Sequence, residues 1–148
     1  MVPRLNPYLA SPQAMQELIS FQDCTYMTGL DVSLMELLRT RVSQINGCAH
    51  GISLHTRNAR ARGETEERLY MLDAWRNAPV YSRRERAALA WTEAVTLVSH
   101  SQVPDGVFEE MRQCFTEEQL VNLTLAIAAT NAWNRVEISF RQIPSVGV

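Results

Sequence analysis

Residues 31–63 read DVSLMELLRTRVSQINGCAHGISLHTRNARARG, and they predict two helices separated by Asn46-Gly47. Apolar residues recur in the first half at the spacing of one buried helix face, at Leu34, Met35, Leu38, Val42 and Ile45. Asp31 is suited to cap the start of this helix, and an Asn-Gly pair is typical of a helix end. We expect the second helix to begin at about Cys48 and to run to Arg62.

The rest of the chain also favours helices, because it contains no sustained apolar–polar alternation of the kind that strands show. Helix starts are expected near Ser11-Pro12, Thr65, Ser82, Pro104 and Thr116, the last helix running to about Phe140. Ser82 and Thr116 are each followed three residues later by Glu or Gln, the pattern of a capping box. The sequence therefore predicts one all-α domain over residues 1–148, a bundle of six to seven helices.

Composition narrows the classes of function. The chain has 148 residues, of which 46% are hydrophobic and 20% charged, as in a globular protein with a real core. A net charge of −2 argues against a broad surface for nucleic acid or for an anionic membrane. All 14 basic residues are arginines, which excludes a lysine Schiff base and a P-loop lysine. With no GxGxxG pattern either, no organic cofactor is expected.

Three cysteines, Cys24, Cys48 and Cys114, cannot form a fully paired disulfide framework. A reducing cytoplasm is the simpler location, and the first residues lack the pattern of a secretory signal. The most apolar stretch, residues 120–133, is too short and too polar to span a bilayer, so we expect a buried helix there. Cys24 and Cys114 are expected in the core.

Reactive side chains are dense only around Cys48, His50 and His55. Seven residues advance a helix by about 700°, which places Cys48 and His55 on one face with Gly51 between them. His50 is about 200° from Cys48 and is expected to face away unless the first turn of the helix is irregular. At a helix start the backbone dipole favours a thiolate at Cys48, and Gly51 is expected to leave an open slot between Cys48 and His55.

Glu36 belongs to the preceding helix and can face His55 if the two helices form a hairpin. A carboxylate beside His55 would orient its ring, giving a Glu36–His55–water–Cys48 relay. The alternative is structural: Cys48 as a small buried apolar residue, His55 as a hydrogen-bonded histidine, and Glu36 paired with Arg39 on its own helix. The C-x-H-x4-H spacing fits no common zinc pattern, so no metal is expected.

Four segments together resemble the alkylhydroperoxidase D / carboxymuconolactone decarboxylase family. They are SQINGC at 43–48, H-T-R-x-A-R from His55, ALAWTEAVT at 88–96 and NAWNR at 131–135. The resemblance implies an all-α fold that assembles as a dimer-based homo-oligomer, often a hexamer. In the peroxidase branch of the family, a C-x-x-C motif is followed four residues later by a histidine. A glutamate on the preceding helix completes a proton relay.

Carried over by resemblance, the catalytic residues are Glu36 and His55 of the relay, Cys48 as the first cysteine, and His50 between the two cysteine positions. The second cysteine position is occupied by Gly51, so an intramolecular disulfide at this motif is excluded. Restoring that thiol with Gly51→Cys is expected to raise dithiol peroxidase activity if the relay is intact.

Three functions stay open at this point. The first is an antioxidant peroxidase of the peroxiredoxin type, in which Cys48 attacks a hydroperoxide and an external thiol reductant restores it. The second is an acid–base enzyme in which His55 and Glu36 act on a small carboxylated lactone held by Arg39 or Arg41. The third is a non-catalytic oligomer.

Overall fold

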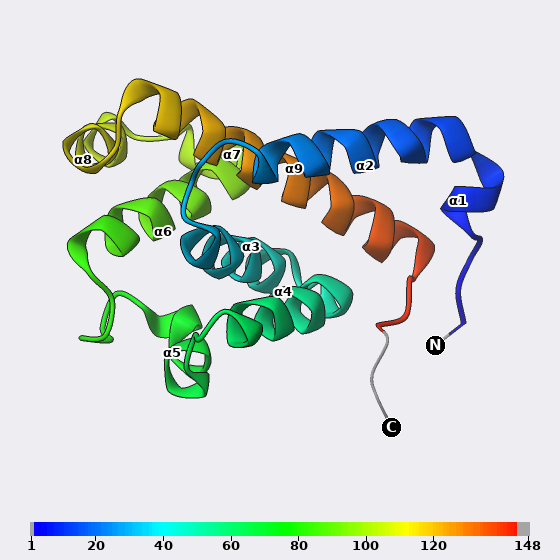
Figure 1. The fold of residues 1–148 in the computed structure, drawn as a ribbon, viewed down its shortest axis with the longest axis horizontal. Helices are drawn as coiled ribbons and strands as arrows, with labels where there is room; N and C mark the ends of the chain where they lie inside the picture. The colour runs from blue at the N-terminus through cyan, green and yellow to red at the C-terminus, as the bar shows by residue number, and fades with distance from the viewer. Residues whose placement is uncertain (1, 145–148) are drawn as a thin grey trace.

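The helix α3 (Val32–Asn46) runs through the centre of the molecule, and three other helices, α4, α6 and α9, pack around it (Figure 1). The computed structural model describes residues 2–144, which contain nine α-helices, one short 3-10 helix and no strand. The remaining elements are α1 (Pro7–Ala10), α2 (Pro12–Tyr26), α4 (Ala49–Ala61), α5 (Glu66–Tyr70), η1 (Leu72–Ala74), α6 (Arg83–Thr96), α7 (Val98–Ser101), α8 (Asp105–Cys114) and α9 (Glu117–Phe140).

The all-α prediction is confirmed, and each of the seven expected helices is present. The two additional helices, α1 and α7, are only four residues long and carry too little periodicity to be read from sequence. The helix expected to start near Thr65 is divided into α5 and η1. Both capping boxes, at Ser82 and Thr116, are formed as predicted.

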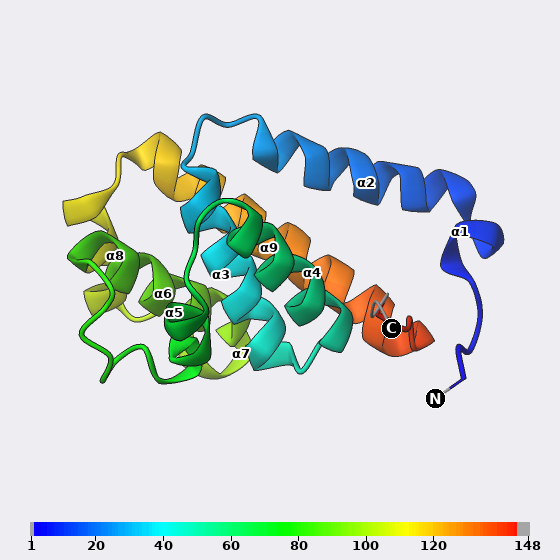
Figure 2. The ribbon, with the colours of Figure 1, turned by 60° about the horizontal axis from the view of Figure 1, so that its bottom comes forward.

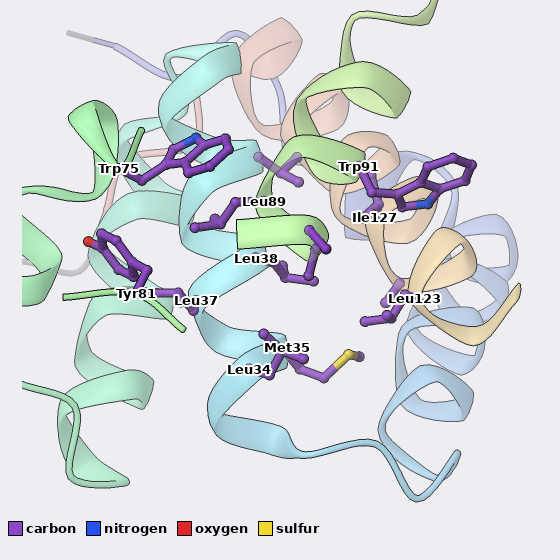
Figure 3. Packing of buried hydrophobic residues seen from close by; sticks show 14 of the residues in the cluster. Leu34, Met35, Leu37, Leu38, Trp75, Tyr81, Leu89, Trp91, Leu123 and Ile127 are labelled. Carbon is purple, nitrogen blue, oxygen red and sulfur yellow. The ribbon is translucent and has the colours of Figure 1, made fainter. Parts of the chain in front are cut away.

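The apolar core lies where α3 meets α6 and α9 (Figure 3). It includes Leu37, Leu38, Trp75, Leu89, Trp91, Leu123 and Ile127. The sequence pattern predicted one buried face of α3, but all ten residues from 34 to 43 are buried. α4, α6 and α9 cover the polar side of α3 as well as its apolar side. Its buried polar side chains therefore need partners inside the protein, because an unpaired buried polar group is costly.

The junction between α3 and α4 sets the direction of the chain at the motif. Gly47 ends α3 with a φ of 68°, a left-handed conformation that glycine adopts without strain. Cys48 is then extended and forms the N-cap of α4, its sulfur accepting a hydrogen bond from the backbone N–H of Gly51. Cys48 thus precedes the helix instead of forming its first turn.

α2 lies along the outside of the bundle beside α9 (Figure 2). Much of its surface faces solvent, and Cys24 is exposed, so the expectation that Cys24 belongs to the core is wrong. Cys114 is half-buried at the edge of the core. α9 leaves Val121 and Leu125 exposed on a helix that is otherwise largely apolar. No helix within residues 2–144 is long and apolar enough to cross a membrane.

Candidate functional site

Glu36 and His55 are paired in the interior between α3 and α4. Glu36 Oε2 lies 2.8 Å from His55 Nδ1, and the Tyr26 hydroxyl donates to Glu36 Oε1 over 2.8 Å. Burial opposes ionisation of Glu36, but the hydrogen bonds from His55 and Tyr26 and the charge of Arg39 outweigh it and hold the pKa of Glu36 below its ordinary value. An ionised Glu36 takes the Nδ1 proton of His55 as its hydrogen-bond partner, which leaves Nε2 as the free ring nitrogen.

Arg39 is 1% exposed and is buried next to the Glu36–His55 pair. Its guanidinium carbon lies 3.7 Å from the centre of the Tyr26 ring, and Nη2 donates to Thr25 Oγ1 over 2.6 Å. Arg39 therefore packs on Tyr26 rather than forming the ion pair with Glu36 that the i, i+3 spacing suggested. Tyr26 was not predicted as part of the site, because its place beside Glu36 depends on how α2 crosses the bundle.

Cys48 is bound by a residue that the sequence did not single out. Its thiol, 1% exposed, donates to Glu137 Oε2 on α9 over 3.0 Å. The other oxygen of Glu137 lies 3.5 Å from His50 Nε2. The start of α4 is irregular because Cys48 is extended, which is the exception allowed for above, so His50 does not face away from Cys48. Cys48 and His50 therefore both lie next to the carboxylate of Glu137.

The environment of Cys48 opposes thiolate formation. Burial, followed by the hydrogen bond to Glu137, raises the pKa of Cys48 to about 12, and the N–H of Gly51 counters only part of this rise. The expectation that the helix start lowers the pKa of Cys48 is therefore wrong for this arrangement. The physical reason is a carboxylate supplied from 89 residues away, which local sequence cannot reveal.

Two neighbouring cavities divide the predicted site residues between them. Cys48 lines a cavity of about 500 Å3, together with the exposed Arg4 and Arg141. His55 lines a separate cavity of about 200 Å3 between α2, α4 and α9. His50 and Glu137 line both cavities. The structure thus places Glu36 beside His55, and it places His50 near Cys48. These two pairs of residues are connected through His50 and Glu137.

The space beside Gly51 is filled. A Cβ built on Gly51 would lie 2.3 Å from Ser43 Oγ and 2.9 Å from Asn134 Nδ2. The open slot expected at Gly51 is therefore not there, because the polar side of α3 and the inner face of α9 occupy it. A water bridge between Cys48 and His55 at this point has no room.

Hydrogen bonds among the side chains of Asn46, Asn131, Asn134 and Ser43, called here the amide ladder, explain why Glu137 of α9 lies next to Cys48. Asn46 Nδ2 donates to Asn131 Oδ1 and to Asn134 Oδ1, both over 3.0 Å. Asn134 Nδ2 in turn donates to Ser43 Oγ over 3.3 Å. Glu137 follows Asn134 by three residues and so lies on the same side of α9, next to the start of α4. The SQINGC and NAWNR segments are thus in direct contact.

Arg39 and Arg41, proposed as carboxylate-binding residues, have other partners. Arg41 is held by Asp73 and by Glu93, whose Oε1 is 2.9 Å from Arg41 Nη2. Neither arginine is among the residues that line the cavities of Cys48 and His55. Across residues 2–144 no group of three or more His, Cys, Asp or Glu side chains is placed to hold a metal ion.

Comparison with known proteins places this geometry in a family. Residues 12–94 match the model of the carboxymuconolactone decarboxylase family. The chain belongs to this family. It is 40% identical over 139 residues to the uncharacterized protein YdfG of Bacillus subtilis (strain 168), covering 94% of this chain and 95% of YdfG.

Solved structures of similar fold come from other bacteria. This family member superimposes with a TM-score of 0.96 and 36% identity on ATU0492 of Agrobacterium tumefaciens, a protein of unknown function described as a putative antioxidant defence protein AhpD. The match covers 99% of this chain and 100% of ATU0492. An uncharacterized peroxidase-related protein of Ralstonia eutropha JMP134 has the same fold, with a TM-score of 0.82 and 21% identity over 98% of this chain and 78% of that one.

Proposed function

We propose that this protein reduces organic hydroperoxides through thiol chemistry at Cys48, as an alkylhydroperoxidase-like antioxidant enzyme. The observation that carries the proposal is the hydrogen bond from Cys48 Sγ to the carboxylate of Glu137, at the wall of a cavity of about 500 Å3. A nucleophile with an adjacent base facing an open cavity is the arrangement that nucleophilic chemistry needs. The likeness to ATU0492, a putative antioxidant defence protein, supports the same reading.

The proposed cycle uses one thiol of the protein and two external thiols. Cys48 attacks the terminal oxygen of the hydroperoxide, forming a sulfenic acid and releasing an alcohol. One external thiol then forms a mixed disulfide with Cys48 and releases water, and a second external thiol regenerates Cys48. Gly51 supplies no resolving thiol, so an external thiol must attack the sulfenic acid directly. The ionised Glu36 orients His55, which we assign to proton exchange at the smaller cavity together with His50.

Steady-state turnover tests the proposal directly. Cumene hydroperoxide consumption is followed with dithiothreitol as the reductant, using a background in which Cys24 and Cys114 are replaced by serine. The proposal predicts saturable consumption that disappears in Cys48→Ser and persists in the background protein. Equal consumption by the background protein and by Cys48→Ser would contradict it.

Acid–base chemistry at His55 is a second candidate, favoured by one observation. His55, hydrogen-bonded to Glu36, lines a cavity of about 200 Å3 that Cys48 does not line. In this alternative a small carboxylated lactone reacts at His55, turnover survives Cys48→Ser, and His55→Ala abolishes it. The two candidates therefore make opposite predictions for Cys48→Ser.

We also infer that the chain works as a homo-oligomer in which α9 contributes to the interface. Val121 and Leu125, four residues apart and so on one side of α9, are 55% and 42% exposed, and a second copy packed there would cover both. Sedimentation equilibrium checks this inference, with a mass of 16.8 kDa per chain as the reference. A monomer at all concentrations would contradict it.

A further inference from the structure

We propose that Glu137 is the catalytic acid–base for Cys48, accepting the thiol proton as sulfur attacks the hydroperoxide and returning it to the departing alkoxide. This inference rests on the proposed peroxidase function and names the residue that carries its proton. Glu137 takes the role of proton acceptor in place of His55, because Cys48 is hydrogen-bonded to a residue of α9 and not to the Glu36–His55 pair.

Geometry gives Glu137 direct access to the reacting atom. Its Oε2 is 3.0 Å from Cys48 Sγ, within the distance at which a thiol proton is transferred. Its other oxygen is 3.5 Å from His50 Nε2, so the carboxylate of Glu137 lies between the thiol of Cys48 and the ring of His50. Glu137 and Cys48 line the same cavity, which places the carboxylate beside the leaving group of a substrate bound there.

His55 lacks such access. It is committed to Glu36 through Nδ1, and it lines the cavity on the other side of His50 and Glu137. Ser43 and Asn134 fill the space beside Gly51 through which a direct route from His55 to Cys48 would pass. The carboxylate of Glu137 is therefore the base that the structure offers to this thiol.

The step balances as follows. The sulfur of Cys48 forms a bond with the terminal, hydrogen-bearing oxygen of ROOH, and the O–O bond breaks. The thiol is oxidised to a sulfenic acid and the peroxide is reduced. The thiol proton moves to Glu137 and from there to RO⁻, which leaves as ROH. No proton or electron is left over, and Glu137 returns to its starting form.

Two reactions of the same sulfur separate a proton carrier from a residue that merely shields the thiol. Alkylation by iodoacetamide expels iodide, which needs no proton, whereas hydroperoxide reduction expels an alkoxide, which does. Both second-order rates at Cys48 are measured in the Cys24→Ser, Cys114→Ser background, with Glu137→Gln and Glu137→Asp. Glu118→Gln is the matched control, since it makes the same change on α9 about 28 Å away along the helix axis.

In Glu137→Gln we expect alkylation to accelerate, by on the order of tenfold for each unit that the thiol pKa falls. Hydroperoxide reduction should slow by roughly a hundredfold because the proton carrier is gone. Glu137→Asp retracts the carboxylate and should slow hydroperoxide reduction less, while Glu118→Gln should leave both rates unchanged.

Hydroperoxide reduction that slows no more than alkylation does in Glu137→Gln would overturn the role of Glu137. If the background protein itself fails to react with the hydroperoxide, the proposed function and this inference fall together. Reaction of the background protein without the expected split overturns the inference alone, so the two failures are distinguishable.

Discussion

The hydroxyl of Ser43 occupies the space in which a side chain at Gly51 would begin, since a Cβ built there would lie 2.3 Å from Ser43 Oγ. Ser43 Cβ is 3.0 Å from the same point, so rotating the hydroxyl away removes only part of the overlap. Residue 51, where the C-x-x-C motif has its second cysteine, therefore has no free space for a side chain, because α3 packs against it. A thiol introduced at residue 51 has to displace a buried contact before it can react.

Gly51→Cys alone is therefore expected to give little dithiol peroxidase activity, which revises the expectation drawn from the motif. Gly51→Ala should lose roughly 1–3 kcal/mol of stability through overpacking. Ser43→Gly in the same chain removes the overlapping atoms of α3, so the double variant should recover at least about 1 kcal/mol relative to additivity. Urea unfolding of the four proteins of the cycle measures this coupling, and strictly additive effects would contradict the packing argument.

His55→Ala should lower the free energy of unfolding by roughly 2 kcal/mol, because it removes a hydrogen bond to a buried, ionised Glu36. His100→Ala is the matched control, since His100 is exposed and should cost almost nothing. Thermal and urea unfolding report the difference. Equal stability of the two variants would mean that the Glu36–His55 bond contributes nothing to the fold.

Acid stability should depend on Glu36. Its pKa lies below the ordinary value of 4.5 in the folded protein, although burial opposes this, because His55, Tyr26 and Arg39 favour the ionised form. Its contribution is present above the ordinary value and is lost as pH falls through the lower, folded value. Glu36→Gln should flatten stability in that acidic range. An unchanged pH profile would show that Glu36 has the same pKa folded and unfolded.

Alkaline stability should depend on Cys48 and Tyr26. Burial is the main cause that raises the pKa of Cys48 from 9.0 to about 12 and that of Tyr26 from 10.0 to about 12. The stability due to each group is present below its ordinary pKa and declines as pH rises toward 12. Unfolding measured between pH 8 and about 11 should show this loss. Cys48→Ser and Tyr26→Phe should each reduce the slope, and an unaltered slope in both variants would argue against the buried environments described above.

The amide ladder should control the environment of Cys48 from a distance. Asn134→Ala removes the hydrogen bonds to Asn46 and Ser43 and should cost roughly 1–3 kcal/mol. The end of α9 then moves away from Cys48, and iodoacetamide should modify the thiol faster. Asn122→Ala, the same change near the start of α9, provides the control. Identical alkylation rates in the two variants would show that Asn134 does not position Glu137.

Sequence patterns predicted much of the fold because helix signals are local. The apolar stripe of α3, the Asn46-Gly47 stop and the two capping boxes depend on residues within a few positions of one another, and each is present. Helices α1 and α7 were missed because four residues do not define a period. The burial of the polar side of α3 was missed because it depends on three other helices packing around it.

The candidate site was predictable only in part, for the same reason. Glu36 could be placed opposite His55, because a tight hairpin brings adjacent helices together, and the two are hydrogen-bonded. Glu137 and Tyr26 reach the site from α9 and α2, so no local pattern connects them to Cys48 or Glu36. The orientation of His50 followed from the extended backbone of Cys48, which helical periodicity cannot represent.

Trapping of the oxidised sulfur tests the central claim most directly. The Cys24→Ser, Cys114→Ser protein is treated with one equivalent of cumene hydroperoxide in the presence of dimedone, and the modified residue is located by peptide mass spectrometry. The account predicts a dimedone adduct on Cys48 and release of one equivalent of alcohol. An unmodified Cys48 with intact hydroperoxide would contradict it and would leave the chemistry of this family member to the Glu36–His55 pair.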